Sequence, residues 1–90
     1  MEEACHRCAA DGDVLGLLHL IGLGIDLNCE GEGGRTPLHE AAKGGHLACV
    51  ELLLQNGAAV DVVDVEDLSA LDYAIAQGES QGVVEKLVSW

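Results

Sequence analysis

Short apolar stretches with helical spacing alternate with glycine-rich or acidic segments along the whole chain. Val50, Leu53 and Leu54 lie three and four positions apart and form one apolar helical face, while Glu51 and Gln55 fall on the other side. The same spacing predicts short helices at Glu3–Asp11, Val14–Leu23, Pro37–Lys43, Leu47–Asn56, Ala70–Gln77 and Gln81–Ser89. Helices this short are unstable in isolation, so each one needs a packed neighbour.

The clearest start and stop signals flank the third predicted helix, in the stretch GGRTPLHEAAKGGH that runs from Gly33 to His46. Thr36 is a good N-cap, and Pro37 falls at the first helical position, where its missing N–H costs nothing. Gly44 and Gly45 then end the helix after about two turns. The small residues on its apolar face allow a second helix to approach closely.

The same pattern recurs when the sequence is compared with itself at a shift of 33 residues. Similar residues then face each other, for example His6 and His39, Gly12 and Gly45, Leu20 and Leu53, Thr36 and Ser69, Leu38 and Leu71, and Ala41 and Ala74. The third copy keeps this register to Gly78, after which one inserted residue places Val84, Leu87 and Val88 opposite the apolar face of the second copy. The chain therefore contains three copies of one sequence repeat.

This period, with TPLHEAAKGGH followed by V-x-x-LL-x-x-G-A, resembles the ankyrin repeat family. The middle copy, Gly34–Val60, matches over nearly its whole length, and the outer copies match more loosely. The resemblance implies an all-α, ankyrin-type helix-turn-helix solenoid in a single domain of residues 1–90, with repeats at about 1–30, 31–63 and 64–90. It also implies β-turn fingers at Cys29–Arg35 and Asp61–Leu68 that project at right angles to the helices.

His39 has two interpretations, as a ligand or general base, or as part of the architecture. The repeat favours the second, and the resemblance implies that Thr36 caps the helix while the imidazole bonds back to the turn. His6 occupies the equivalent position of the first repeat, so the same interpretation applies to it.

Cys5-x-x-Cys8 suggests a metal site, but the repeat register places both cysteines at core positions, where Cys packs as a small hydrophobic residue. No metal and no cofactor are expected.

Composition limits the function further. Ninety residues suit one small domain, and sixteen acidic against four basic side chains give a net charge of −12. Such a chain should repel nucleic acid and anionic membranes. The sequence lacks GxSxG, HExxH and a phosphate-binding glycine loop, so no enzymatic activity is expected.

The start of the chain lacks the basic segment with which a signal peptide begins. We therefore expect the protein to be located in the cytoplasm, with the nucleus as the alternative.

The resemblance places recognition on the fingers and on exposed positions of the inner helices. The partner-binding candidates are Glu32, Arg35, Glu40 and Lys43 in the middle repeat, Val65, Glu66, Leu68, Tyr73 and Ala76 in the third, and Arg7 and Asp11 in the first. Val65, Leu68 and Tyr73 suggest an apolar contact patch with an acidic rim, and hence a partner with basic residues around a hydrophobic anchor. Alternatively, Val65 and Leu68 fold back on their own finger or pack on a further repeat.

We therefore expect a protein–protein interaction module or scaffold that binds another protein through its fingers and its concave inner-helix face. The alternative is a regulatory fragment of a larger ankyrin-containing protein or enzyme. Asn28 follows a segment, Gly24–Leu27, that is similar to the one modified by asparaginyl hydroxylases in this family, so it is a possible modification site. Its alternative role is a turn-forming side chain bonded to the backbone.

Overall fold

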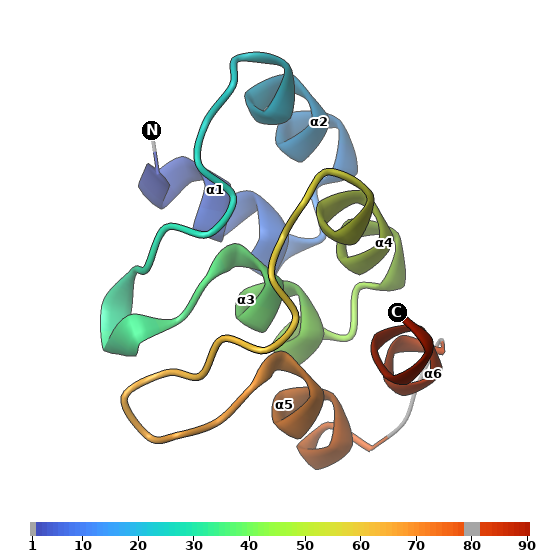
Figure 1. Cartoon of the computed structure of the whole chain (residues 1–90). Helices are drawn as coiled ribbons and strands as arrows, with labels where there is room; N and C mark the ends of the chain where they lie inside the picture. The colour runs from blue at the N-terminus through green and yellow to red at the C-terminus, as the bar shows by residue number, and fades with distance from the viewer. Residues whose placement is uncertain (1, 79–81) are drawn as a thin grey trace.

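The structure is a computed structural model that describes residues 2–78 and 82–90. Within these ranges the chain forms six α-helices and one short 3-10 turn, with no strand in the described part (Figure 1). The elements are α1 (Glu2–Asp11), α2 (Val14–Gly22), η1 (Glu32–Gly34), α3 (Pro37–Gly44), α4 (Leu47–Gln55), α5 (Ala70–Ala76) and α6 (Val83–Ser89). The predicted helices are thus confirmed to within two residues at each end, and the predicted start of the last one, Gln81, lies outside the described residues.

The helices form two parallel rows. The inner row contains α1, α3 and α5, and each of these packs against the next (Figure 1). The outer row contains α2, α4 and α6, and each outer helix also packs against the inner helix that precedes it in the chain. Two loops, residues 29–35 and 61–68, extend from the inner row as fingers. The all-α helix-turn-helix solenoid predicted from the repeat is confirmed.

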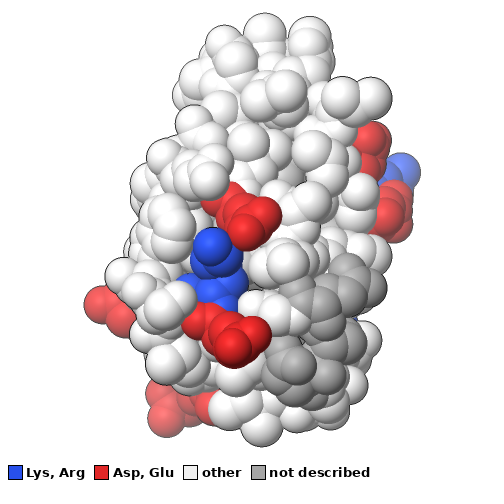
Figure 2. All heavy atoms as spheres, turned by 90° about the vertical axis from the view of Figure 1, so that its right-hand side faces the viewer, with Lys and Arg blue, Asp and Glu red and all other residues white. Residues whose placement is uncertain are grey.

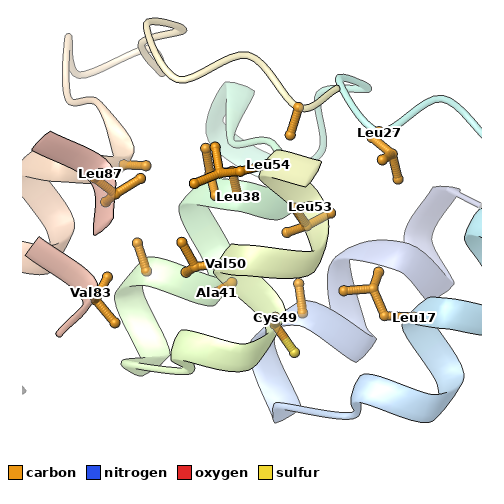
Figure 3. Close-up of a cluster of buried hydrophobic side chains, with 14 of the residues drawn as sticks. Leu17, Leu27, Leu38, Ala41, Cys49, Val50, Leu53, Leu54, Val83 and Leu87 are labelled. Carbon is orange, nitrogen blue, oxygen red and sulfur yellow. The ribbon is translucent and has the colours of Figure 1, made fainter. Parts of the chain in front are cut away.

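The core lies between the two rows and is made almost entirely of Leu, Val, Ala and Cys. Figure 3 shows it as a continuous series of side chains, from Val83 and Leu87 at one end to Leu17 and Leu27 at the other. Its most deeply buried members include Leu17, Leu38, Ala41, Ala42, Cys49, Val50 and Leu53. Because alanines occupy the inner helices where they meet, the helices can approach closely without aromatic side chains between them.

Two capping boxes start the inner helices of the second and third repeats. In α3 the Thr36 hydroxyl oxygen accepts from the His39 backbone N–H (3.4 Å), and the Thr36 N–H donates to His39 Nδ1 (3.1 Å). In α5 the Ser69 hydroxyl and the Asp72 carboxylate make the equivalent exchange. Each box satisfies two backbone donors that a helix start would otherwise leave unpaired, which confirms Thr36 as the N-cap.

The histidines at equivalent positions also link one repeat to the next. His6 Nε2 donates to the Arg35 carbonyl oxygen (2.9 Å), and His39 Nε2 donates to the Leu68 carbonyl oxygen (3.0 Å). His39 Nδ1 already accepts from Thr36, so the proton on Nε2 is available for the carbonyl. Both bonds therefore fasten an inner helix to the finger of the following repeat. The architectural interpretation of His39 and His6 is confirmed.

Gly12 and His46 form a third contact between repeats. His46 Nε2 donates to the Ala10 carbonyl oxygen (3.0 Å), which lies at the end of α1. Gly12 has a φ of +75°, and a Cβ atom there would lie only 2.7 Å from His46 Nδ1. Glycine is therefore required at position 12 both for its backbone conformation and for the approach of the imidazole.

Three details differ from the sequence prediction. Val88 was expected on the buried face of the last helix but is 67% exposed, because α6 packs against α5 and α4 on one side only. Cys8 is half-buried rather than a full core residue, and its Sγ lies 3.9 Å from an oxygen of Asp13. Glu51 was expected to face water but forms an ion pair with Lys86, with an N–O distance of 3.2 Å.

Leu53 provides a direct test of the core. Its side chain is 0% exposed between the two helix rows, so Leu53→Ala should leave a cavity and lower the free energy of unfolding by about 2–5 kcal/mol. Urea unfolding followed by circular dichroism measures the change. As a control, Gln55→Ala on the exposed side of the same helix should stay within about 0.5 kcal/mol of the wild type. Equal effects of the two substitutions would contradict the core assignment.

Candidate functional site

The inner-row side of the first two repeats contains a recess of about 710 Å³ between α1, the first finger and α3. Its walls come from three places in the sequence, since the end of α1 forms one side and the η1 finger and α3 form the others. The lining residues are His6, Arg7, Ala10, Asp11, Glu30, Gly31, Glu32, Arg35 and Glu40. Two short backbone bonds shape the finger side, from the Gly31 N–H to the Arg35 carbonyl (2.7 Å) and from the Gly34 N–H to the Gly31 carbonyl (3.0 Å).

Arg35 and Glu40 form an ion pair in the wall of this recess. Arg35 Nε donates to Glu40 Oε2 at 3.1 Å, and both side chains are mostly covered. The hydrogen bond to the Glu40 carboxylate raises the pKa of Arg35 further above its already high value. This pair is fixed across the start of α3, so it stiffens the wall and has little charge left to offer a partner.

The other acidic groups of the recess face solvent. Asp11, Glu30 and Glu32 are exposed around its edge, and Arg7 lies among them on α1. Four carboxylates therefore outnumber two arginines around the recess. With one carboxylate already paired to Arg35, the exposed ones give the recess a negative potential that attracts cations.

A smaller hollow of about 310 Å³ continues the recess along the inner row. It is lined by Ala10, Glu40, Lys43 and Gly44. The structure thus brings together all four candidates of the middle repeat, Glu32, Arg35, Glu40 and Lys43, with Arg7 and Asp11 of the first repeat. His6, Ala10, Glu30 and Gly31 also line the recess but were not among the sequence candidates. Of these, Glu30 could have been predicted, because it lies in the same finger as Glu32.

Tyr73 is held in place by neighbouring side chains. Its hydroxyl donates to Asp64 Oδ2, and its ring meets the His39 ring edge-on, with centroids 5.7 Å apart and planes at 86°. The hydrogen bond to Asp64 raises the pKa of Tyr73, and the same bond lowers the pKa of Asp64. Tyr73 is half-buried rather than a freely projecting contact residue, so it also supports the second finger.

Asp64 organises that finger from the inside. It is only 7% exposed, and its Oδ1 accepts from the Glu66 N–H (2.9 Å) and the Leu68 N–H (3.0 Å). The resulting turn leaves Val65 78% exposed and Leu68 half-buried. The Val65 N–H also donates to the Gly33 carbonyl oxygen (3.0 Å), so the two fingers are joined through their backbones.

The third-repeat candidates form a group separate from the recess. Val65, Glu66 and Leu68 lie on the second finger, and Tyr73 and Ala76 lie on α5, with Glu66 and Ala76 exposed. None of them lines the recess. Arg35 connects the two groups, because Glu40 first and Tyr73 after it both contribute to raising its pKa. The predicted binding residues therefore occupy two neighbouring areas on the finger side of the inner row.

Two of the four cysteine thiols are directed into the core. Cys5 and Cys49 are fully buried, and burial is the main cause that raises the pKa of the Cys5 thiol to about 11. Burial also raises the pKa values of Cys8 and Cys49. Among the described residues, no three His, Cys, Asp or Glu side chains lie together in a way that could hold a metal ion. In the same ranges, no helix is both long and apolar enough to cross a membrane.

Asn28 bridges two repeats. Its Oδ1 accepts from the Ala59 N–H (2.7 Å), and its Nδ2 donates to the Gly57 carbonyl oxygen (3.4 Å). The bonding of Asn28 to the backbone that the sequence suggested is therefore present, but its partners lie in the following repeat and not in the turn around Asn28 itself. Modification of the exposed Asn28 side chain by a hydroxylase stays a prediction.

A family model described as ankyrin repeats, in three copies, matches residues 5–90. The chain belongs to the ankyrin repeat family. Ankyrin repeats are generally protein–protein interaction modules, and the fold is typically non-catalytic. The geometry agrees with this membership, since the capping box of α3 and the bridges from the two equivalent histidines follow the 33-residue register.

Relatives of this ankyrin domain occur in proteins of different kinds. SMC5-SMC6 complex localization factor protein 1 of Homo sapiens is 38% identical over 79 residues, which is 86% of this chain and 8% of the relative. Ankyrin repeat domain-containing protein 37 of Homo sapiens is 37% identical over 77 residues, 86% of this chain and 49% of that protein. The crystal structure of the human ASB11 ankyrin repeat domain superposes with a TM-score of 0.89 at 39% identity.

That superposition covers 94% of this chain and 38% of the ASB11 chain. The chain spans about half of the ankyrin repeat domain-containing protein 37 relatives and less than a tenth of the localization factors. The shared part is therefore the repeat fold, and it does not include the rest of these proteins.

The hydrogen bond from Tyr73 to Asp64 predicts a pH effect on stability. The pKa of Asp64 lies below its ordinary value of 3.8 in the fold, so the carboxylate stabilises the folded state above that value. This stabilisation is lost as the pH falls through the lower folded pKa. Asp64→Asn should therefore make the urea midpoint fall less steeply than in the wild type between about pH 5 and pH 2.

The matched control is Asp67→Asn, an exposed position in the same turn with a φ of 66°, which asparagine also adopts readily. It should keep the wild-type pH dependence. If Asp64→Asn and the wild type lose stability in parallel on acidification, the bond from Tyr73 does not contribute as the geometry indicates.

Proposed function

We propose that this ankyrin repeat domain binds a partner protein through the recess between α1, the first finger and α3. The observation that carries the proposal is a recess of about 710 Å³ in which four carboxylates surround two arginines. Its size suits one or two side chains of a partner, and its charge favours Lys or Arg. The partner therefore has a basic segment that enters on the finger side of the inner row.

The internal ion pair supports this proposal. Because Arg35 and Glu40 are already bonded at 3.1 Å, they form a wall that needs little rearrangement when a partner binds. Asp11, Glu30 and Glu32 are then the groups that attract the incoming cation, and they are exposed before binding. A guanidinium group suits such a site, since its donors can reach two carboxylates together.

The third repeat supplies the apolar part of the proposed surface. Val65 presents most of its side chain to solvent beside the half-buried Leu68, and Glu66 adds a carboxylate on the same finger. Tyr73 and Ala76 extend the area along α5. A hydrophobic side chain of the partner placed on Val65 and Leu68 would complement a basic segment in the recess, because apolar anchors with a charged surround are common in interfaces.

We also propose that the domain acts in the cytoplasm, with the nucleus as the alternative. The thiols of Cys5, Cys8 and Cys49 are not in disulfides, which is usual in a reducing compartment. The second candidate function is regulation within a larger protein. It is favoured by the relatives, because the matching segment is less than a tenth of the length of the localization factors.

Charge reversal in the recess tests the first proposal. Glu32→Lys should prevent capture of partners from a cytosolic extract that the immobilised wild-type domain retains, because it replaces an attractive charge with a repulsive one. Quantitative mass spectrometry of the captured proteins gives the readout. The control is Glu85→Lys, which makes the same charge change at an exposed position of α6 in the outer row. Equal losses with both variants, or no loss with Glu32→Lys, would contradict the proposed site.

The apolar area has a separate test. Val65→Ala combined with Leu68→Ala should weaken binding of those same partners by about tenfold while the helical circular dichroism stays unchanged. The Leu68 carbonyl that His39 needs is kept, because it belongs to the backbone. Tyr73→Ala is less suitable, since it would also remove the ring that contacts His39. Unchanged binding would confine the interface to the recess.

A further inference from the structure

The outer side of α2 exposes three leucines that take no part in the core. Leu15 is 79% exposed, Leu18 is 50% exposed and Leu23, which caps the helix, is 56% exposed. Leu17 and Leu20 of the same helix are buried, so the side of α2 that faces the core already has its own apolar side chains. We refer to Leu15, Leu18 and Leu23 as the α2 leucine patch.

The equivalent positions of the second repeat show that the fold does not need these leucines. At a shift of 33 residues, Leu15, Leu18 and Leu23 correspond to Ala48, Glu51 and Asn56. α4 packs between α2 and α6 with Ala48 and Asn56 exposed and with Glu51 partly exposed in its ion pair with Lys86. Leucine usually occurs where its side chain is buried in the core. Leu15, Leu18 and Leu23 are exposed, so their presence needs another explanation.

The charge around the patch is unusual for this molecule. α2 contains no Asp, Glu, Lys or Arg, although the chain carries a net charge of −12. Figure 2 shows the corresponding upper part of the outer face without charged side chains, while acidic and basic groups appear lower, over α4 and α6. Exposed aspartates lie at both ends of the patch, Asp13 before α2 and Asp26 after it.

We propose that the α2 leucine patch docks an amphipathic helix of a partner protein, with apolar residues over the leucines and a Lys or Arg near each end. The patch runs roughly 12 Å along α2 from Leu15 to Leu23, which matches about two turns of a helix. Asp13 and Asp26 each use an oxygen for a backbone N–H, from Gly16 (3.0 Å) and Asn28 (2.9 Å), so both carboxylates are held in position beside the patch.

Charge also argues against a second copy of this chain as the occupant. A symmetric pair through the patch would bring the aspartates of both copies together, in addition to the repulsion between two molecules of charge −12. A basic amphipathic helix removes both difficulties. The patch belongs to the outer row, away from the recess, so this inference is independent of the function proposed above.

The test uses a variant designed from the second repeat. Leu15→Ala, Leu18→Glu and Leu23→Asn together give α2 the residues that the second repeat carries at these positions, so the variant should fold and keep the helical circular dichroism of the wild type. The probe is a fluorescein-labelled synthetic helical peptide with leucines on one side and lysines at both ends, titrated by fluorescence anisotropy. A second peptide of the same composition, with a shuffled order that has no apolar side, measures attraction by charge alone.

The wild type should bind the amphipathic peptide at least about tenfold more tightly than the triple variant does, and more tightly than it binds the shuffled peptide. Glu32→Lys in the recess should leave this binding unchanged. Absence of binding to the wild type, or equal affinity of the triple variant, would overturn the proposal. Finally, sedimentation measures whether the wild type and the triple variant form dimers without any peptide. A dimer of the wild type that is absent from the triple variant would show that a second copy of the chain occupies the patch, and would overturn the proposal.

Discussion

The hydrogen bond from an inner-helix imidazole to a carbonyl of the next finger is the interaction on which the rest of the structure depends. His6 reaches the Arg35 carbonyl and His39 reaches the Leu68 carbonyl, at 2.9 and 3.0 Å. Each of these carbonyls also accepts a backbone bond inside its own finger, Arg35 from the Gly31 N–H (2.7 Å) and Leu68 from the Asp64 N–H (3.0 Å), so the imidazole links a finger that is already closed to the preceding helix. Each bond therefore sets the position of one finger relative to the preceding helix. Loss of the imidazole would remove this link, and at His39 it would also remove part of the capping box of α3.

This constraint extends into the candidate binding surface. The ring of Tyr73 rests on His39, the Tyr73 hydroxyl bonds to Asp64, and Asp64 holds the backbone of the second finger. Arg35 touches the same network from the first finger and pairs with Glu40. The exposed carboxylates and Val65 are thus carried on a scaffold of satisfied polar groups. A domain of this kind loses little conformational freedom when it binds, because its contact surface is ordered beforehand.

The repeat, the helix bounds and the caps could be predicted from the sequence because they depend on residues close together in the chain. Thr36 with Pro37 and the paired glycines act locally, and the 33-residue register extends them to the other copies. The recess was only partly predictable, since it joins the end of α1 to a finger that follows much later. Tyr73 was expected to project, and nothing local in the sequence shows that its hydroxyl finds Asp64. Val88 was expected inside, but the contacts of α6 with α5 and α4 leave its side chain 67% exposed, which its spacing along the helix does not show.

Comparison of repeats within one chain separates the demands of the fold from other demands. Where two copies keep the same buried residue, as at Ala9 and Ala42 or at Ala41 and Ala74, packing explains the choice. Where the copies differ at an exposed position, the fold tolerates both residues and some further property must select between them. Leu23 and Asn56 occupy such a pair, and so do the exposed Glu32 of the first finger and Val65 of the second. The positions at which the repeats disagree are therefore the ones at which to look for partners, and in this chain they fall on both rows of helices.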